Sequence, residues 1–360
     1  MSEQIQIENK RKCFFTIPLV FLSDFLSTNG FEKYRAKQIF ESVYKNFIFD
    51  FDAMSVLPAP LKKILTEHFY FSSAELLSEK KSKQDAGKFL FKLNDGALIE
   101  SVLLTAPTDD GDIRKTICIS TQVGCAQGCK FCASTQNGFK RNLTSDEIIS
   151  QFITFTERKE KRFIFENVVV MGMGEPLANL ENVLNALKIL NENFAFGARR
   201  ITISTAGLAD KILHLAQIDF PYRLAVSLHA TSDEIRNQIM PINKKFPLKE
   251  LFDALKIFSQ KSKRMITLEY ILIESLNDSL ESAKSLAKIA KNLHAHVNLI
   301  PYNTVEELDW KRPSLAKSKA FLACLEKEKI SASLRHEKGS DIEAACGQLA
   351  LKTAKKIARI

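Results

Sequence analysis

The stretch Gly124-Cys125-Ala126-Gln127-Gly128-Cys129-Lys130-Phe131-Cys132 decides how we interpret the fold, because it carries three cysteines at the spacing C-x-x-x-C-x-x-C. Three thiolates on one short loop can bind three irons of a 4Fe–4S cluster and leave the fourth iron open to a small molecule. The glycines Gly124 and Gly128 relax the backbone, so that the loop can wrap around a bulky inorganic group.

Two other uses of these cysteines fit less well. Structural zinc normally has four protein ligands, and the sequence contains no second C-x-x-C and no H-x-x-x-H. A disulfide is disfavoured because no export signal is found: the apolar run 14–22 is interrupted by Thr16 and Pro18 and is too short to span a bilayer. The spacing is typical of radical S-adenosylmethionine (SAM) enzymes, and we interpret it in that way.

Strand and helix patterns alternate on both sides of the cysteine loop. Counting the strand that precedes the loop, they predict six βα units, and such alternation favours a parallel sheet with helices outside. Six units make a partial (βα)6 barrel more plausible than a closed eight-unit barrel, although the pattern alone leaves a flat doubly wound sheet open. The strands are expected at 114–121, 167–171, 200–204, 223–228, 265–273 and 297–300.

The chain before the loop has a different character. Residues 1–85 have helical apolar spacing with basic residues between, which suggests an RNA-binding piece, although a packing role fits almost as well. A hairpin over 88–104 follows, turning at Asn94-Asp95-Gly96. We therefore predict an accessory domain over 1–95, a radical SAM core over 111–343 and a C-terminal helix over 344–360.

Composition gives weaker indications of partner and compartment. The formal net charge is +9, and phosphates reward clustered Lys and Arg, so an RNA or DNA partner is modestly favoured. The seven cysteines are odd in number and unevenly clustered. This suits a reducing compartment and metal or redox use better than a disulfide framework.

Polar and glycine-rich residues follow several of the predicted strands. Ligands bind at the carboxyl ends of strands in such sheets, and Glu175 could pair with a ligand ammonium there. Taken singly, each residue has a structural explanation: Glu175 could end a tight turn, and His229 could be hydrogen-bonded in the core. Near the C-terminus Cys346 precedes Gly347, and from these residues alone an inert core cysteine is favoured. The strand-end residues are Gly174, Glu175, Ser204, Ser227, Leu228, His229 and Asn303.

From about Phe31 to Leu349 the chain resembles the RlmN family, dual-specificity adenine-C2 RNA methyltransferases of the radical SAM superfamily. The resemblance rests on the cysteine loop and on several further motifs. One departure is Lys338-Gly339-Ser340-Asp341, where the family usually has Arg-Gly-x-Asp, so that bidentate hydrogen bonding is lost. The further motifs are Ile117–Gly124, Gly138–Leu143, Val170–Leu177, Ser227–Ala230, Pro241–Lys245 and Asp341–Leu349.

The resemblance implies a role for each matching position. Cys125, Cys129 and Cys132 would bind the 4Fe–4S cluster, and the strand-end residues Gly174 to Asn303 named above would bind SAM. Cys346 would accept a methyl group, Cys118 would be its disulfide partner, and Glu100 would accept a proton. The fold would be a partial (βα)6 barrel with an N-terminal, mainly helical accessory domain.

The implied reaction is methylation of adenosine C2 in 23S rRNA at the peptidyl transferase centre and in tRNA next to the anticodon. Adenine C2 is electron-poor, so the methyl group would pass through Cys346, with two SAM used per methylation. The implied partners are these RNAs and a one-electron donor protein; the protein is expected to be a cytoplasmic monomer without membrane attachment. The alternatives are a Cfr-type C8 methyltransferase and a non-catalytic, metal-bound RNA-binding protein.

Overall fold

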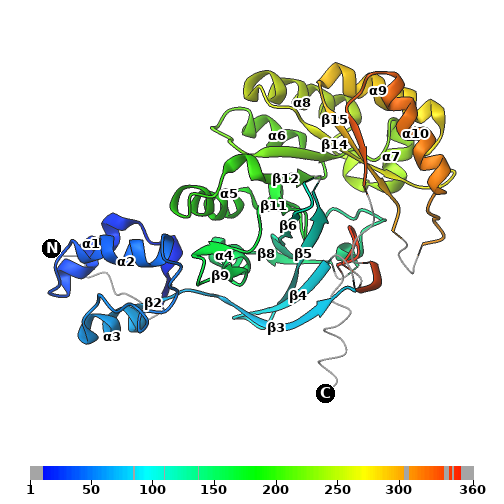
Figure 1. Cartoon of the computed structure of the whole chain (residues 1–360). Coiled ribbons are helices and arrows are strands. Elements are labelled where there is room, and N and C mark those ends of the chain that lie inside the picture. The colour runs from blue at the N-terminus through cyan, green and yellow to red at the C-terminus, as the bar shows by residue number, and fades with distance from the viewer. Residues whose placement is uncertain are drawn as a thin grey trace.

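The computed structural model describes residues 11–83, 86–108, 110–136, 138–303, 308–335, 340–342 and 344–349. Its centre is a ten-stranded sheet with the strand order β16-β15-β14-β13-β12-β11-β6-β5-β4-β3 (Figure 1). The strands from β6 to β16 pair in parallel, and the two ends of this order do not meet. The parallel strands are β6 (Ile113–Cys118), β11 (Asn167–Val170), β12 (Ile201–Thr205), β13 (Arg223–Ser227), β14 (Thr267–Leu272), β15 (His296–Pro301) and β16 (Ala332–Leu334).

Helices connect the parallel strands, as the right-handed crossovers of a parallel sheet require. Together they confirm the predicted partial (βα)6 barrel, which the short strand β16 extends by one. The predicted capping box opens α4, where the backbone N–H of Thr144 donates to Glu147 Oε2 over 2.9 Å. The helices are α4 (Ser145–Ile153), α5 (Leu180–Lys188), α6 (Ala209–Leu215), α7 (Asp233–Ile239), α8 (Leu248–Ser262), α9 (Leu280–Leu293) and α10 (Leu315–Lys327).

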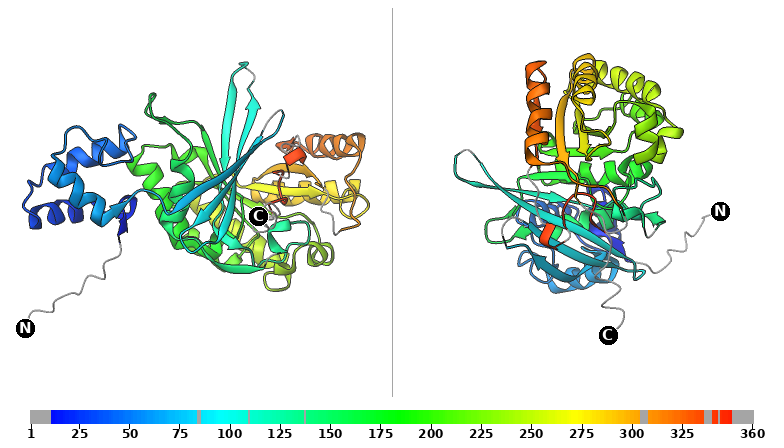
Figure 2. Two further views of the ribbon diagram at one scale, coloured as in Figure 1. Left: turned by 90° about the horizontal axis from the view of Figure 1, so that it is seen from below. Right: turned by 90° about the vertical axis from the view of Figure 1, so that its right-hand side faces the viewer.

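An antiparallel extension continues the sheet beyond β6. The predicted hairpin is confirmed as β4 (Ala86–Leu93) and β5 (Leu98–Pro107), and β5 pairs with β6. The additional strand β3 (Ala74–Lys81) lies in a segment predicted to be helical. Its side chains are largely exposed and a bulge between Leu76 and Ser78 breaks the alternation, so the sequence carries little strand signal there. Figure 2 shows the extension projecting from the helix-covered part of the molecule.

The N-terminal helices form a small aromatic-rich unit, drawn in blue in Figure 1. Phe14 lies in its centre, with its ring centroid 5.3 Å from that of Phe71 and 5.8 Å from that of Phe51. Phe47 joins the unit to the barrel, because its ring lies 5.4 Å from Phe194 after α5. This confirms a mainly helical accessory unit; where the domains divide remains a prediction. Its helices are α1 (Leu19–Thr28), α2 (Arg35–Tyr44) and α3 (Ala59–His68).

Described residues after β16 pack against the sheet extension, where Ala344 and Leu349 lie in one apolar cluster with Val102 of β5. Ser340–Ile342 form the short 3-10 turn η7, and residues 344–349 form turns rather than the predicted helix. The rest of that predicted helix, residues 350–360, lies outside the described residues. In the part of the chain that the structure describes, no helix has the length and apolar character needed to cross a membrane.

Several short elements complete the described chain. Short two-stranded sheets lie between the larger elements, and the one formed by β7 and β8 flanks the cysteine loop. They are β1 (Lys12–Cys13), β2 (Phe69–Tyr70), β7 (Gln122–Gly124), β8 (Phe139–Asn142), β9 (Thr156–Glu157), β10 (Arg162–Phe163), the 3-10 turns η1 (Phe14–Thr16), η2 (Ala133–Thr135), η3 (Pro176–Asn179), η5 (Ala198–Arg200) and η6 (Pro241–Lys244), and the π-turn η4 (Ile189–Asn193).

Candidate active site

The cysteine loop begins where β7 pairs with β8. Gly124 adopts φ +76°, and a Cβ atom at this position would lie 1.7 Å from the carbonyl oxygen of Gly138. Only glycine fits so close an approach in a left-handed conformation. Further along, Lys130 N donates to Ile239 O over 3.0 Å, which ties the loop to the end of α7. The loop is therefore held at both ends.

All three loop cysteines line one pocket of the barrel. Burial raises the pKa of Cys125 to about 12 and that of Cys129 well above its ordinary value, and the neighbouring cysteines add to the effect on Cys129. Because metal ligation requires thiolates, loading the site must release protons. The positive charge of bound iron would compensate the negative charge of the buried thiolates.

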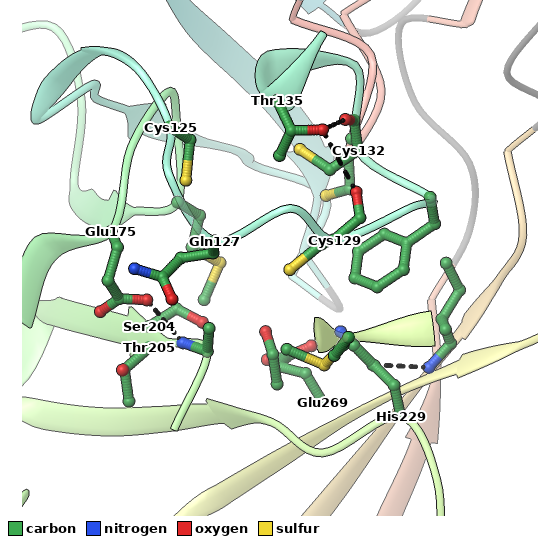
Figure 3. Close-up of a pocket in the computed structure, with 18 of the residues that line it drawn as sticks. Cys125, Gln127, Cys129, Cys132, Thr135, Glu175, Ser204, Thr205, His229 and Glu269 are labelled. Carbon is green, nitrogen blue, oxygen red and sulfur yellow. Dashed lines mark hydrogen bonds between the residues drawn. The ribbon is translucent and has the colours of Figure 1, made fainter. Parts of the chain in front are cut away.

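The arrangement of the three sulfurs fits a cluster. In the described ranges, no group of three His, Cys, Asp or Glu side chains is arranged to hold a single metal ion. A cubane cluster binds each thiolate through a different iron, so its ligands surround a hollow instead of converging on one point. Figure 3 shows the cysteines along one side of the hollow, facing Glu175, Ser204, His229 and Glu269 on the other.

The pocket brings together most of the residues predicted from the sequence. Its lining comes from the loop, from the carboxyl ends of β11 to β15, and from the C-terminal segment. The turns after parallel strands thus converge at one end of the sheet, as the strand order requires. Among the predicted residues, those that line it are Cys125, Cys129, Cys132, Gly174, Glu175, Ser204, Ser227, His229 and Cys346.

Glu175 is a buried carboxyl group at the centre of this wall. Its Oε1 accepts Leu177 N over 2.9 Å and its Oε2 accepts Ala206 N over 2.7 Å. Burial raises its pKa to about 7, and the two amides oppose this shift only in part. A ligand ammonium beside Glu175 would restore the charged carboxylate.

His229 is held in one protonation state. Its Nδ1 accepts the backbone N–H of Ile271 over 3.0 Å, so Nε2 carries the proton of the neutral ring. Burial, together with the charge of Arg236, lowers its pKa to about 3. The ring packs edge-on against Phe131 of the cysteine loop, with the centroids 4.8 Å apart. His229 therefore offers a hydrogen-bond donor and no titratable base near neutral pH.

Leu228 and Asn303 are not among the residues that line the pocket, but each is hydrogen-bonded to one that does. The backbone N–H of Leu228 donates to Glu269 O over 3.0 Å. Asn303 Nδ2 donates to Cys346 O over 3.3 Å, while its buried Oδ1 has no hydrogen-bond partner among the described residues. Such an orphaned acceptor suits a ligand that brings an N–H or O–H group.

Cys118 and Cys346 approach each other across the sheet extension. Cys118 ends β6, and Cys346 is exposed on the C-terminal segment. Burial, together with the nearby Cys346 sulfur, raises the pKa of Cys118 to about 12, and the charge of Arg335 opposes this shift in part. All seven cysteines are free thiols, so the disulfide implied by the resemblance is absent from this structure.

Glu100 lies on β5, outside the pocket lining. It is fully buried, and Lys88 Nζ lies 3.2 Å from its Oε1. Val102, two residues further along β5, pairs directly with Cys118 on β6, so Glu100 shares a sheet face with Cys118. Glu100 is thus a neighbour of Cys118 in the sheet and not of the cysteine loop.

Two charged residues of the pocket, Glu269 and Arg335, were not singled out from the sequence. Glu269 sits within an apolar strand, where its carboxylate accepts Asn298 Nδ2 over 2.7 Å. Arg335 follows β16, and the neighbouring Cys346 sulfur is the main cause that raises its pKa. Arg335 follows a strand, as most of the identified residues do, so its position was the available signal; Glu269 lies within a strand and carried no such signal.

The partial barrel and its three-cysteine loop define a radical SAM protein. Residues 119–287 match the family model described as "Radical SAM superfamily", and residues 18–71 match "Ribosomal RNA large subunit methyltransferase N-terminal domain". The chain is also similar to a crystal structure of a radical SAM methyltransferase from Sphaerobacter thermophilus. The TM-score is 0.87 at 39% identity, covering 94% of this chain and 99% of that one.

Curated relatives show to which family of radical SAM proteins the chain belongs. The chain is 51% identical over 344 residues to "Probable dual-specificity RNA methyltransferase RlmN 3" of Opitutus terrae, covering 92% of each chain. It is 48% identical to the Akkermansia muciniphila protein named "Probable dual-specificity RNA methyltransferase RlmN", covering 91% of this chain and 92% of that one. The chain belongs to the RlmN family of radical SAM RNA methyltransferases.

Proposed function

We propose that this enzyme methylates C2 of adenosine in 23S rRNA and in tRNA through a methyl group carried on Cys346. The observation that supports this most is the position of Cys346, which lines the same pocket as Cys125, Cys129 and Cys132 although it lies far from them in sequence. Ala133 N donates to Gly347 O over 2.7 Å, so the cysteine loop itself holds the Cys346 segment in place. An ordinary packing role would not require an exposed thiol there.

Cys125, Cys129 and Cys132 would hold a 4Fe–4S cluster, and the pocket wall would hold SAM. Glu175 suits the ammonium of SAM; Asn303 Oδ1, Ser204 and Ser227 offer partners for its other polar groups. Gly174, Leu228 and His229 would complete the wall. When bound, the cluster supplies the electron that cleaves SAM, and SAM supplies both the methyl group and the hydrogen-abstracting radical.

This chain's own residues then have separate tasks. The Cys346 thiolate accepts the methyl group and carries it to the adenine, since C2 is too electron-poor to attack SAM directly. Cys118 resolves the covalent adduct by forming a transient disulfide with Cys346, which releases the methylated RNA. The C2 proton leaves to Glu100 or to Cys118, both of which lie on the sheet face that the C-terminal segment covers.

RNA binding would involve the N-terminal unit and the net charge of +9. We also propose that the chain divides into an accessory, RNA-binding domain over 1–95, a radical SAM core over 111–343 and a C-terminal segment over 344–360 that carries Cys346. We further propose that the enzyme works as a cytoplasmic monomer with a one-electron donor protein.

The test is anaerobic turnover of the iron-reconstituted protein with methyl-deuterated SAM and unmodified rRNA or tRNA, followed by mass spectrometry of nucleosides and peptides. We expect label at adenosine C2 in both RNAs and on Cys346 before RNA is added. Label at C8 alone would favour a Cfr-type enzyme and overturn the proposal. A protein that binds zinc and no iron would reduce it to an RNA-binding role.

A further inference from the structure

Arg236 is a fully buried arginine that the reaction scheme does not use. It belongs to α7 and its side chain is 0% exposed, which is rare for arginine because burying a guanidinium requires compensating contacts. All three nitrogens of its guanidinium donate hydrogen bonds. Nε donates to Leu228 O over 3.0 Å, Nη2 to Ala206 O over 2.8 Å and to Ser227 O over 3.1 Å, and Nη1 to Asn243 Oδ1 over 2.9 Å.

These contacts fix the wall proposed to hold SAM. Ala206 follows β12, and Ser227 and Leu228 end β13, so one side chain clamps the carboxyl ends of two adjacent strands. The Ala206 peptide is held from both sides, because its N–H donates to Glu175 Oε2 over 2.7 Å while its oxygen accepts Arg236. The position of Glu175 relative to β13 therefore depends on Arg236.

The same helix supports the cysteine loop. Ile239, one turn after Arg236, accepts the backbone N–H of Lys130 over 3.0 Å. A Cβ atom on Gly128 would lie 3.5 Å from Pro241 Cγ, so the loop residues just before Cys129 rest on the segment after α7. The buried cation is thus directly beneath the loop that would hold the cluster.

The charge of Arg236 has no directly bonded anion among the described residues. All four acceptors of its fork are uncharged carbonyl or amide oxygens. Asp233 attracts the guanidinium from a distance but accepts its own hydrogen bonds from Asn243 Nδ2 and Leu248 N. A thiolate at Cys129 would attract it as well, more strongly than Asp233 does. The charge is therefore available to the thiolates of the loop.

We propose that Arg236 is a positioning residue for both cofactors: its fork fixes the SAM-binding strand ends, and its buried charge stabilises the reduced cluster at Cys129. Reduction adds one negative charge to the cluster, and a fixed cation in a medium of low dielectric constant favours that charge. The inference rests on the cofactor assignment proposed above and adds a residue to which that assignment gives no role.

Three full-length variants separate the two effects after anaerobic reconstitution. Arg236→Gln removes the charge, Arg236→Lys keeps it but loses the fork, and Asn243→Ala breaks one contact of the fork without changing charge. The midpoint potential is measured by a redox titration followed by electron paramagnetic resonance. SAM binding is measured by the change that SAM causes in the spectrum of the reduced cluster.

We expect Arg236→Gln to disfavour reduction by about tenfold, which is 59 mV for one electron, while Arg236→Lys and Asn243→Ala keep the wild-type potential. Arg236→Lys should bind SAM about tenfold more weakly, because one ammonium cannot hold both strand ends. An unchanged potential in Arg236→Gln, or an equal shift in Asn243→Ala, refutes the electrostatic role.

Two further outcomes keep the inference testable. If Arg236→Gln fails to fold, Arg236→Lys alone decides: wild-type SAM affinity, or a potential that shifts with the loss of the fork, contradicts the proposal. If the wild-type protein assembles no cluster, the proposed function fails first. If the wild-type protein assembles the cluster but the variants keep its midpoint potential and SAM affinity, only the role proposed for Arg236 is refuted.

Discussion

Gly124→Ala is the sharpest test of how the cysteine loop is built. The added methyl carbon would lie 1.7 Å from Gly138 O, whereas non-bonded heavy atoms prefer about 3.5–4.0 Å. Because the obstacle is backbone rather than a flexible side chain, β7 and β8 must separate. The substitution therefore moves the start of the loop that carries Cys125.

The cost has two parts. An alanine at φ +76° costs about 1–2 kcal/mol, since an L residue is strained in the left-handed region. Opening β7 from β8 adds the loss of backbone hydrogen bonds, at about 0.5–1.5 kcal/mol each. If separating β7 from β8 costs about 3 kcal/mol in addition to the strain at φ, the fraction of molecules whose loop has the cluster-binding geometry falls roughly a hundredfold.

Gly96→Ala is the matched control. Gly96 has nearly the same φ, +82°, but a Cβ atom there meets nothing within 4 Å. We expect Gly96→Ala to lower the melting temperature by a few degrees, at about 2–4 °C per kcal/mol, and to take up iron normally. Gly124→Ala should take up little iron and sulfide and lack the broad visible absorption band of the cluster.

The measurements are iron and sulfide per chain after anaerobic reconstitution, together with thermal unfolding followed by circular dichroism. Equal iron uptake by the two variants would show that the loop tolerates the displaced strand, and our account of its construction would be wrong. Equal loss of iron in both would assign the effect to backbone strain alone.

Four further predictions concern the pocket wall, the thiols and the fold of the barrel. SAM should bind the loaded protein about tenfold more weakly at pH 6 than at pH 8, because the pKa of Glu175 is about 7 and the ammonium needs the carboxylate; Glu175→Gln should remove this dependence, and a pH-independent wild type would refute it. In the cofactor-free protein, stability should change with pH in the direction opposite to SAM affinity. The contribution of the raised Glu175 pKa to stability is complete below the ordinary value of 4.5 and is lost as the pH rises through about 7. Urea unfolding of wild type and Glu175→Gln measures this change. Cys346→Ala should abolish methylation and keep the cluster spectrum, whereas Cys324→Ala on α10 should keep both; an active Cys346→Ala enzyme would exclude the methyl carrier. Asn277→Ala should destabilise the fold by about 2 kcal/mol or more in urea unfolding, because its amide bonds His229 O, Ile271 O and Ile273 N inside the barrel; a change below about 0.5 kcal/mol would contradict this.

The sequence predicted the barrel because its signals are local. Apolar strands, capping boxes and turn glycines recur in order, and a parallel sheet places their carboxyl ends together without further information. Glu175, Ser204 and Ser227 were found in this way, and the structure brings them into one pocket. What they bind remains a proposal, since position alone does not identify a ligand.

The elements that the sequence missed depend on contacts between distant segments. The strand β3 is an exposed, bulged partner of β4, so its register is set by pairing and not by its own alternation. The segment 344–349 was expected to begin a helix, but it forms turns instead, and Gly347 O accepts Ala133 N of the loop. Arg236 reads as an exposed helix charge until its four buried acceptors are known.

One buried hydroxyl links the two halves of the proposed chemistry. Ser120 Oγ donates to Glu100 O over 2.6 Å and accepts Met173 N over 2.9 Å, so it joins β5 to the turn that precedes Glu175. Gln151 on α4 holds the backbone of Ser120 as well. Its Oε1 accepts the Ser120 N–H and its Nε2 donates to the Ser120 carbonyl oxygen, each over 2.9 Å. The barrel wall proposed for SAM and the strand that carries Glu100 are therefore held at one fixed separation. If Cys346 carries the methyl group between these two surfaces, as proposed, it would need such a spacing, because one short side chain cannot compensate for a shift of either wall.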